Sequence, residues 1–121
     1  MRITRSSDTV ATAMDPEHFT GPATRRALGE MEEPAALVIV ASFEPGTQTH
    51  WHRHSDGQVL YVLSGAGRIC TRGGDAVDIG PGDFVHAPPG EEHWHGASDT
   101  EPMSHVALSF GVTDWLERSD G

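Results

Sequence analysis

Glycine and proline interrupt this sequence so often that only short regular elements fit between them. The 121 residues include 14 glycines and 8 prolines. The short apolar and β-branched runs between them lie at residues 35–43, 59–63, 68–71, 76–79, 83–86 and 103–110. Short runs at regular spacing, separated by Gly and Pro turns, are typical of β-sandwiches and β-barrels. The sequence therefore predicts an all-β fold.

One domain accounts for a chain of this length, and 121 residues can bury a sizeable core without disulfides. We expect the barrel over residues 35–112, since the apolar runs fall within that range. Residues 1–34 are polar and mixed, which predicts an N-terminal arm with an edge strand at about residues 20–28. Residues 113–121 are expected to form a tail or a short helix capped by Thr113 or Asp114.

The charge balance argues against nucleic-acid and membrane partners. The formal net charge is −10 and the 8 basic residues are scattered arginines, so a phosphate backbone would be repelled on average. No apolar stretch is long enough to cross a bilayer, and the N-terminal residues lack the apolar run of a secretory signal. Cys70 is the single cysteine, so no internal disulfide can form. We therefore expect a cytoplasmic protein that acts on a small molecule.

Histidines gather in two blocks, each close to glycine and proline turns. The histidines within these blocks are His50, His52, His54, His93 and His95. On a strand, residues two apart point to the same face, so His52 and His54 would share one face. Imidazole nitrogens that converge in this way are typical ligands of divalent transition metals. The two blocks therefore predict a metal site.

The spacing within the blocks resembles the two sequence motifs of the cupin superfamily. The first motif has a glycine, five residues, His-x-His, three or four residues, a glutamate, six residues and a glycine. Its places are filled here by Gly46, His52, His54, Gln58 and Gly65. The second motif has a glycine, five residues, Pro-x-Gly, two residues and a histidine, and its places are filled by Gly82, Pro88, Gly90 and His93. Gln58 replaces the glutamate, and Ala97 replaces the second motif's final asparagine.

The resemblance implies a small jelly-roll β-barrel that holds one divalent metal ion inside. The implied ligands are His52, His54, Gln58 and His93. All four donors are neutral, so the ion would keep its full 2+ charge. It would be a stronger Lewis acid, and held less tightly, than in a site with a glutamate. A nitrogen-rich site without thiolates suits Mn(II), Fe(II), Co(II), Ni(II) or Zn(II).

Two further histidines are candidates for catalysis. His95 has the same strand parity as His93 and is expected to point into the barrel. His105 shares parity with Ala107 and Ser109, if the apolar residues between them pack on the other face of the strand. A histidine inside the barrel and near a cation would stay neutral and could act as a general base.

A narrower resemblance, to the bacterial cupin (R)-hydroxynitrile lyases, extends from about residue 35 to 117. The similar segments are residues 43–46, 51–54, 57–58, 89–91, 93–97, 103–105 and 114–115. Those enzymes carry manganese in a site of three histidines and one glutamine. The resemblance therefore favours Mn(II) and implies that His95 and His105 are the active-site histidines. It also places along the substrate cavity Ile39, Ala41 and Thr49, and the same pocket would be shaped by Ser109.

The mechanism that we predict combines a Lewis acid with a histidine general base. His105 would remove the hydroxyl proton of a cyanohydrin, and cleavage of the carbon–carbon bond would release cyanide and an aldehyde. His95 would protonate or position the leaving group. Three alternatives stay open at this point: an Fe(II)-dependent dioxygenase, a non-catalytic cupin that binds a small molecule, and a polyketide cyclase or isomerase.

The resemblance to cupins also implies a homodimer or a homotetramer, because cupins usually associate through their outer sheets. The candidates for the interface are Trp51, Trp94 and the apolar run 35–43. Both tryptophans have the opposite parity to the flanking histidines, so we expect them to pack outside the barrel. His50 could line the cavity mouth or lie at an exposed edge, and the sequence leaves the placement of His86 open.

Overall fold

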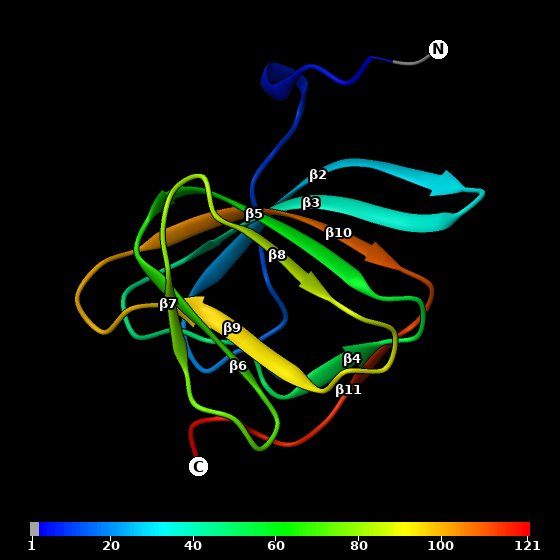
Figure 1. The fold of residues 1–121 in the computed structure, drawn as a ribbon. Coiled ribbons are helices and arrows are strands. Elements are labelled where there is room, and N and C mark those ends of the chain that lie inside the picture. Colours follow the sequence, from blue (N-terminus) through cyan, green and yellow to red (C-terminus); the bar gives the residue numbers. More distant parts are fainter. Residues whose placement is uncertain (1–2) are drawn as a thin grey trace.

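Two antiparallel β-sheets face each other across the interior of the molecule (Figure 1). The computed structural model describes residues 3–121. Within those residues the only helical element is the single-turn 3-10 helix η1 (Ser6–Asp8), and no helix there has the length and apolar character to span a membrane. The predicted all-β jelly-roll barrel is thereby confirmed.

The larger sheet has six strands in the order β1-β2-β3-β10-β5-β8. Its strands are β1 (Thr12–Ala13), β2 (Ala23–Glu32), β3 (Ala35–Phe43), β10 (Met103–Phe110), β5 (Gln58–Gly65) and β8 (Phe84–Ala87). The smaller sheet has five strands in the order β11-β4-β9-β6-β7. Its strands are β11 (Thr113–Trp115), β4 (His52–His54), β9 (His93–Ala97), β6 (Gly67–Thr71) and β7 (Val77–Ile79).

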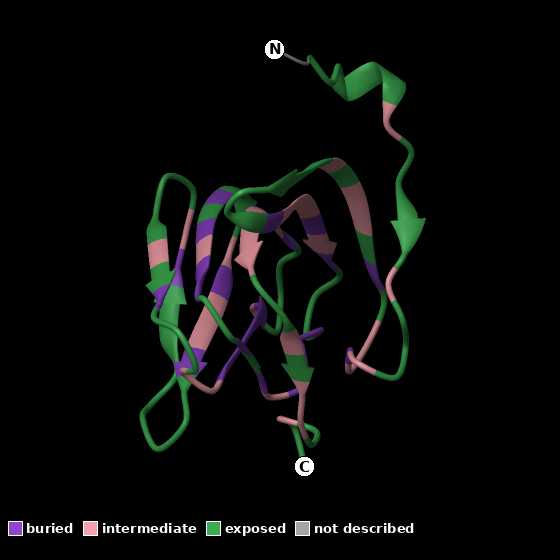
Figure 2. Ribbon diagram, turned by 90° about the vertical axis from the view of Figure 1, so that its right-hand side faces the viewer, coloured by how far each residue is buried: buried purple, intermediate pink, exposed green. Residues whose placement is uncertain are grey.

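Alternation along the strands separates the interior from the outer faces. On β4, His52 and His54 are buried and Arg53 is exposed. On β10, His105 and Ala107 are buried, whereas the residues beside them are only partly buried. Figure 2 shows the buried residues concentrated on the strands that enclose the interior, while the segment with η1 stands away from the barrel and is mainly exposed.

The interior contains an apolar core and, beside it, a group of buried polar side chains. The core residues are Phe19, Ala23, Ala41, Phe43, Val62, Ile79, Ala97 and Met103. The buried polar residues include His52, His54, Gln58, His93, His95 and His105. Burial of unpaired polar groups is costly, so a gathering of imidazoles inside a small barrel indicates a binding site rather than ordinary packing.

Gly96 lets a loop lie directly against β9. A Cβ atom at this position would come within 2.3 Å of the Thr47 carbonyl oxygen. The close approach allows Thr49 N to donate to the His95 carbonyl oxygen at 2.9 Å, and His95 N to donate to Thr49 Oγ1 at 3.2 Å. The glycine next to the second histidine block therefore fixes Thr49 beside His95.

The C-terminal segment forms a strand, so the predicted short helix after residue 112 is wrong. Residues Thr113–Trp115 form β11, which pairs with β4 so that Trp115 lies opposite His52. Thr113, the expected helix cap, instead has its Oγ1 atom 3.0 Å from His54 Nδ1. Trp115 packs against the apolar core. Pairing with β4 and burial of a large ring outweigh the local helix signal.

Strand β2 extends further than the edge strand predicted at about residues 20–28. It runs from Ala23 to Glu32 and pairs with β3 along its length. Its first residues are also covered by β1 on the other side. The far ends of β2 and β3 project from the barrel as a two-stranded arm (Figure 1).

The two tryptophans that flank the histidine blocks differ in their surroundings. Trp94 is buried, with 7% of its surface exposed, so it offers little area for a contact with another subunit. Trp51 is partly buried, and the guanidinium carbon of Arg72 lies 4.1 Å from the centroid of its ring. Trp94 is therefore a weaker candidate than Trp51 for the predicted interface.

Candidate metal centre

The smaller sheet brings four histidines to one interior face. His52 and His54 are 1% and 4% exposed, and both project inward from β4. Strand β4 pairs with β9 at His52 and His93. His95 follows two residues later on β9 and is 4% exposed. Strand pairing thus brings the two sequence blocks together.

Three of these histidines lie close enough to share one ion. One ring nitrogen from each of His52, His93 and His95 lies within 4.8 Å of the other two. The ring centroids are 4.5 Å apart for His52 and His93, and 5.1 Å apart for His52 and His95. A buried group of three imidazoles suits a divalent transition metal.

Backbone carbonyls orient two of these rings. His52 Nδ1 lies 2.9 Å from the His50 carbonyl oxygen, and His93 Nδ1 lies 3.0 Å from the Glu91 carbonyl oxygen. A carbonyl oxygen only accepts hydrogen bonds, so each Nδ1 donates and each neutral ring keeps a lone pair on Nε2. Metal-binding histidines are commonly held in this way.

Gln58 reaches the histidines from the opposite sheet. Its Nε2 atom donates to Ser109 Oγ at 3.0 Å, which turns Oε1 toward His93 Nε2, also at 3.0 Å. Both atoms of the second contact are acceptors, so two lone pairs point into the same space with no proton between them. A cation in that space would satisfy both, and the residues present therefore fit a metal ion.

His54 contributes another nitrogen without a partner. Its Nε2 atom is buried and has no hydrogen bond within residues 3–121. Its ring centroid lies 5.0 Å from that of His52 and 5.7 Å from that of His93. The structure thus gathers the residues predicted as ligands, together with a fifth donor: His52, His54, Gln58, His93 and His95.

Burial keeps these imidazoles neutral. It lowers the pKa of His93 below the ordinary value, and the pKa values of His52 and His95 well below it, with neighbouring imidazoles adding to the effect for the latter two. Burial and the nearby His93 together lower the pKa of His54 to about 4. Neutral imidazoles retain the lone pairs that metal binding requires.

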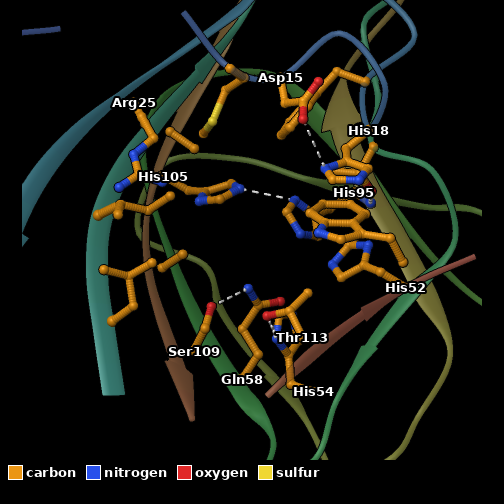
Figure 3. A pocket seen from close by; sticks show the side chains of 18 of the residues that line it. Asp15, His18, Arg25, His52, His54, Gln58, His95, His105, Ser109 and Thr113 are labelled. Carbon is orange, nitrogen blue, oxygen red and sulfur yellow. Dashed lines mark hydrogen bonds and ion pairs between the residues drawn. The ribbon is translucent and has the colours of Figure 1, made fainter. Parts of the chain in front are cut away.

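His105 enters from the larger sheet and meets His95. It is fully buried on β10, and its Nε2 atom lies 3.0 Å from His95 Nδ1 (Figure 3). One of these nitrogens donates and the other accepts, so the protonation states of the two rings are linked. Burial lowers the pKa of His105 to about 4, and the ring is therefore available as a neutral base.

A cavity of about 610 Å³ opens beside these histidines. Its walls include His52, His54, Gln58, His95 and His105. The residues that we predicted to lie along a substrate cavity are also in its walls: Ile39, Ala41, Thr49 and Ser109. The volume is in the range of sites that bind small organic molecules.

The N-terminal segment supplies a cavity wall that the sequence did not reveal. Met14, His18 and Phe19 all line the cavity. The His18 ring stacks on Trp115, with centroids 4.3 Å apart and planes only 4° from parallel. This segment has no strand or helix periodicity, and its position depends on a tryptophan near the other end of the chain. A local sequence pattern could not have identified it.

Neither of the histidines that the sequence left unplaced is among the described residues that line the cavity. His50 is 9% exposed and uses its backbone carbonyl to orient His52. His86 lies on β8, where its side chain is exposed.

A jelly-roll barrel with a buried histidine group beside a ligand-sized cavity defines a class of metal-binding β-barrel proteins. Residues 39–109 match the family described as Cupin domain. The chain belongs to the cupin family, as its motif spacing predicted.

Two relatives of the chain differ in their named activities. The chain is 45% identical over 105 residues to an (R)-mandelonitrile lyase of Granulicella tundricola, a match that covers 82% of this chain and 79% of that protein. It is 40% identical over 65 residues to an acireductone dioxygenase of Rhodopseudomonas palustris, but that match covers only 51% of this chain and 36% of the dioxygenase.

The fold also agrees with a solved structure. A cupin-like protein of Thermotoga maritima has a TM-score of 0.84 and 35% identity, with 88% of this chain and 85% of that chain covered.

Proposed function

We propose that this cupin is a metal-dependent lyase that cleaves a cyanohydrin into an aldehyde and cyanide, and that catalyses the reverse addition. The observation that carries the proposal is the His95–His105 pair, which lies in the same cavity as the group of neutral metal-binding donors. Similarity to (R)-mandelonitrile lyase over most of both chains supports this reaction.

The proposed ligands are His52, His54, Gln58 and His93, and the proposed ion is Mn(II), with Fe(II), Zn(II), Ni(II) and Co(II) as substitutes. When bound, the ion supplies a Lewis acid and an undiminished positive charge near the developing anions. Ser109 supports the site by accepting a hydrogen bond from Gln58, which holds the amide oxygen toward His93.

The paired histidines move the proton. The hydroxyl proton of the cyanohydrin passes to His105 as the carbonyl forms and the bond to the nitrile carbon breaks, with its electron pair leaving on cyanide. The same proton then passes to cyanide, so hydrogen cyanide and the aldehyde are released. His95 holds the His105 ring in place through the 3.0 Å contact between them.

The test is release of benzaldehyde from mandelonitrile by the metal-loaded protein under mildly acidic conditions, where the uncatalysed reaction is slow. We expect His105→Ala to keep its metal and to lower kcat by about 10²- to 10⁴-fold, the usual contribution of a general base. Metal content by elemental analysis and benzaldehyde absorbance give the two readouts. A fully metal-loaded protein without cyanohydrin cleavage contradicts the proposal.

The second candidate function is an Fe(II)-dependent dioxygenase. The partial similarity to an acireductone dioxygenase favours it, and a site of imidazole and amide donors with open positions also suits Fe(II) and oxygen. Oxygen consumption separates the two functions, because cyanohydrin cleavage uses no oxygen. Uptake of oxygen by the Fe(II)-loaded protein together with a substrate, and no benzaldehyde release, would select the dioxygenase.

We also propose a homodimer or homotetramer built on the outer face of the larger sheet. Tyr61 and Phe84 lie opposite each other on β5 and β8 and are 47% and 65% exposed. Val106 pairs with Tyr61 on one side and with Val40 on the other, so one apolar row crosses four strands. Light scattering should show an oligomer that Phe84→Glu dissociates. A monomeric parent protein contradicts this assembly.

A further inference from the structure

Arg25 brings a positive charge into the cavity that contains the histidines. On β2 it lies opposite Ala41 of β3, which lies opposite His105 of β10. These three residues form a row across the inner face of the larger sheet, and all three line the cavity. Figure 3 shows Arg25 and His105 on the same side of the cavity, across from His52 and His95.

The Arg25 guanidinium has no hydrogen-bond or ion-pair partner within residues 3–121. In contrast, five other arginines donate to an oxygen atom of the protein: Arg26, Arg53, Arg68, Arg72 and Arg118. An unpaired guanidinium presents up to five N–H donors in a flat fork that matches a carboxylate. Arg25 is therefore free to bind a ligand in the cavity.

The formal charges of the residues that line the cavity balance, even though the whole chain is acidic. The only carboxylate among the described residues that line it is Asp15, which accepts a hydrogen bond from Glu17 N at 2.9 Å and faces His18 at 3.9 Å. The metal-binding donors described above are neutral. The cavity therefore lacks the excess of negative charge that the formal net charge of −10 gives to the molecule.

We propose that Arg25 binds a carboxylate on the substrate, so that the preferred substrates are small aldehydes and cyanohydrins with a carboxylate remote from the reacting carbon. This inference rests on the proposed lyase function. Two strand spacings, about 10 Å, separate the backbones of Arg25 and His105, and both residues line the cavity. A benzene ring with a carboxylate and an aldehyde at opposite ends matches that span.

A pair of ligands that differ only in charge tests the proposal by binding alone. Calorimetry on the metal-loaded protein, without cyanide, compares 4-formylbenzoate with the neutral 4-formylbenzamide. A bidentate charged contact should make the carboxylate bind at least about tenfold more tightly. Arg25→Gln should remove that preference, and Arg25→Lys should keep part of it because the positive charge remains.

Arg26→Gln is the matched control. Arg26 is the next residue of β2 and lies outside the cavity wall, where its guanidinium donates to the Thr9 carbonyl oxygen at 2.7 Å. The control removes the same charge and should keep the preference for the carboxylate. Equal binding of the two ligands to the parent protein would overturn the role of Arg25. An equal loss of the preference for the carboxylate in Arg25→Gln and Arg26→Gln would also overturn it.

The two proposals fail separately. If the protein prefers 4-formylbenzoate through Arg25 but cleaves no cyanohydrin, the lyase function is contradicted and the carboxylate site is supported. If mandelonitrile and its 4-carboxylate are cleaved with equal kcat/KM, in both the parent protein and Arg25→Gln, the carboxylate site is contradicted and the lyase function is supported.

Discussion

His54 and His95 both offer a buried Nε2 atom that has no hydrogen-bond partner within the described residues. They differ at the other ring nitrogen, because His95 Nδ1 contacts His105 and His54 Nδ1 contacts the hydroxyl of Thr113. The ring of His95 is thus linked to the proposed base, whereas the ring of His54 is held only by β11. This difference favours His54 as the ligand and His95 as the residue that positions His105.

Alanine variants separate these two roles. We expect His54→Ala to weaken Mn(II) binding by more than about 100-fold, and His95→Ala to weaken it less, because residues outside the coordination sphere typically contribute about 10- to 100-fold. Titration of the metal-free protein with Mn(II) gives both values. If only His95→Ala lost affinity for Mn(II), His95 would replace His54 in the proposed ligand set.

The neutral charge of Gln58 should set the balance between metal affinity and reactivity. Gln58→Glu adds a negative charge beside the ion, so we expect tighter metal binding and lower lyase turnover. The hydroxyl of Ser109 can donate to the new carboxylate and preserve the geometry. The control is Gln48→Glu, since Gln48 donates to Ser119 Oγ and does not line the cavity. Weaker metal binding by Gln58→Glu would contradict the argument.

Residue spacing predicted the histidines well because strand parity is a local property. Two-residue spacing was enough to place His52 with His54, and His93 with His95, on the interior face. Arg25 could not be found in this way. Its direction depends on the register between β2 and β3, which also contains an irregularity between Ala27 and Gly29. Long-range pairing of this kind leaves no mark in a short stretch of sequence.

At the scale of elements, short strands and turns were predictable and the two ends of the chain were not. Gly and Pro residues lie at the ends of the strands in the barrel, since those residues favour turns. Residues 113–115 carry a good helix cap, yet β4 offers them backbone hydrogen bonds and Trp115 finds an apolar site. Tertiary contacts decided that element against its local preference.

Two glycines with similar backbone angles provide a test of the turn geometry. Gly65 has a φ of +81° and a Cβ there would lie 1.8 Å from the Pro102 carbonyl oxygen, whereas Gly73 has a φ of +85° with nothing within 4 Å. We expect Gly73→Ala to cost about 1 kcal/mol in the free energy of unfolding, from the backbone conformation alone. Gly65→Ala should cost several times more.

Denaturant unfolding of the two alanine variants measures the difference. Loss of soluble folded protein in Gly65→Ala alone also supports the steric argument, because Gly73→Ala shares the same strained φ. Equal costs in the two variants would show that the contact with residue 102 is relieved by a small shift of the chain.

At the scale of the whole molecule, the buried imidazoles couple folding to pH once the metal is removed. Burial lowers the pKa of His54 and His105 from 6.5 to about 4. Between these values the unfolded chain binds more protons than the folded chain, so the free energy of unfolding falls as the pH falls. Each of these two histidines should lower the free energy of unfolding by about 2 kcal/mol at about pH 5 relative to neutral pH.

Thermal unfolding of the metal-free protein from pH 7 to pH 5 tests this coupling. We expect Tm to fall across that range, and bound metal should oppose the fall as long as the imidazoles remain occupied. His105→Gln should make the slope shallower, because it removes one of the buried imidazoles. A Tm that is independent of pH in the metal-free protein would contradict the neutral state of the buried histidines.

The two sheets supply different walls of the cavity, and this arrangement suits directed evolution. The histidine group comes from β4 and β9, whereas Leu37, Ile39 and Ala107 line the opposite wall from β3 and β10. A combinatorial library restricted to these three aliphatic positions would reshape the space offered to an incoming aldehyde and keep the backbone carbonyls that orient His52 and His93. Variants that accept other aldehydes could then be selected without any change to the proposed metal ligands.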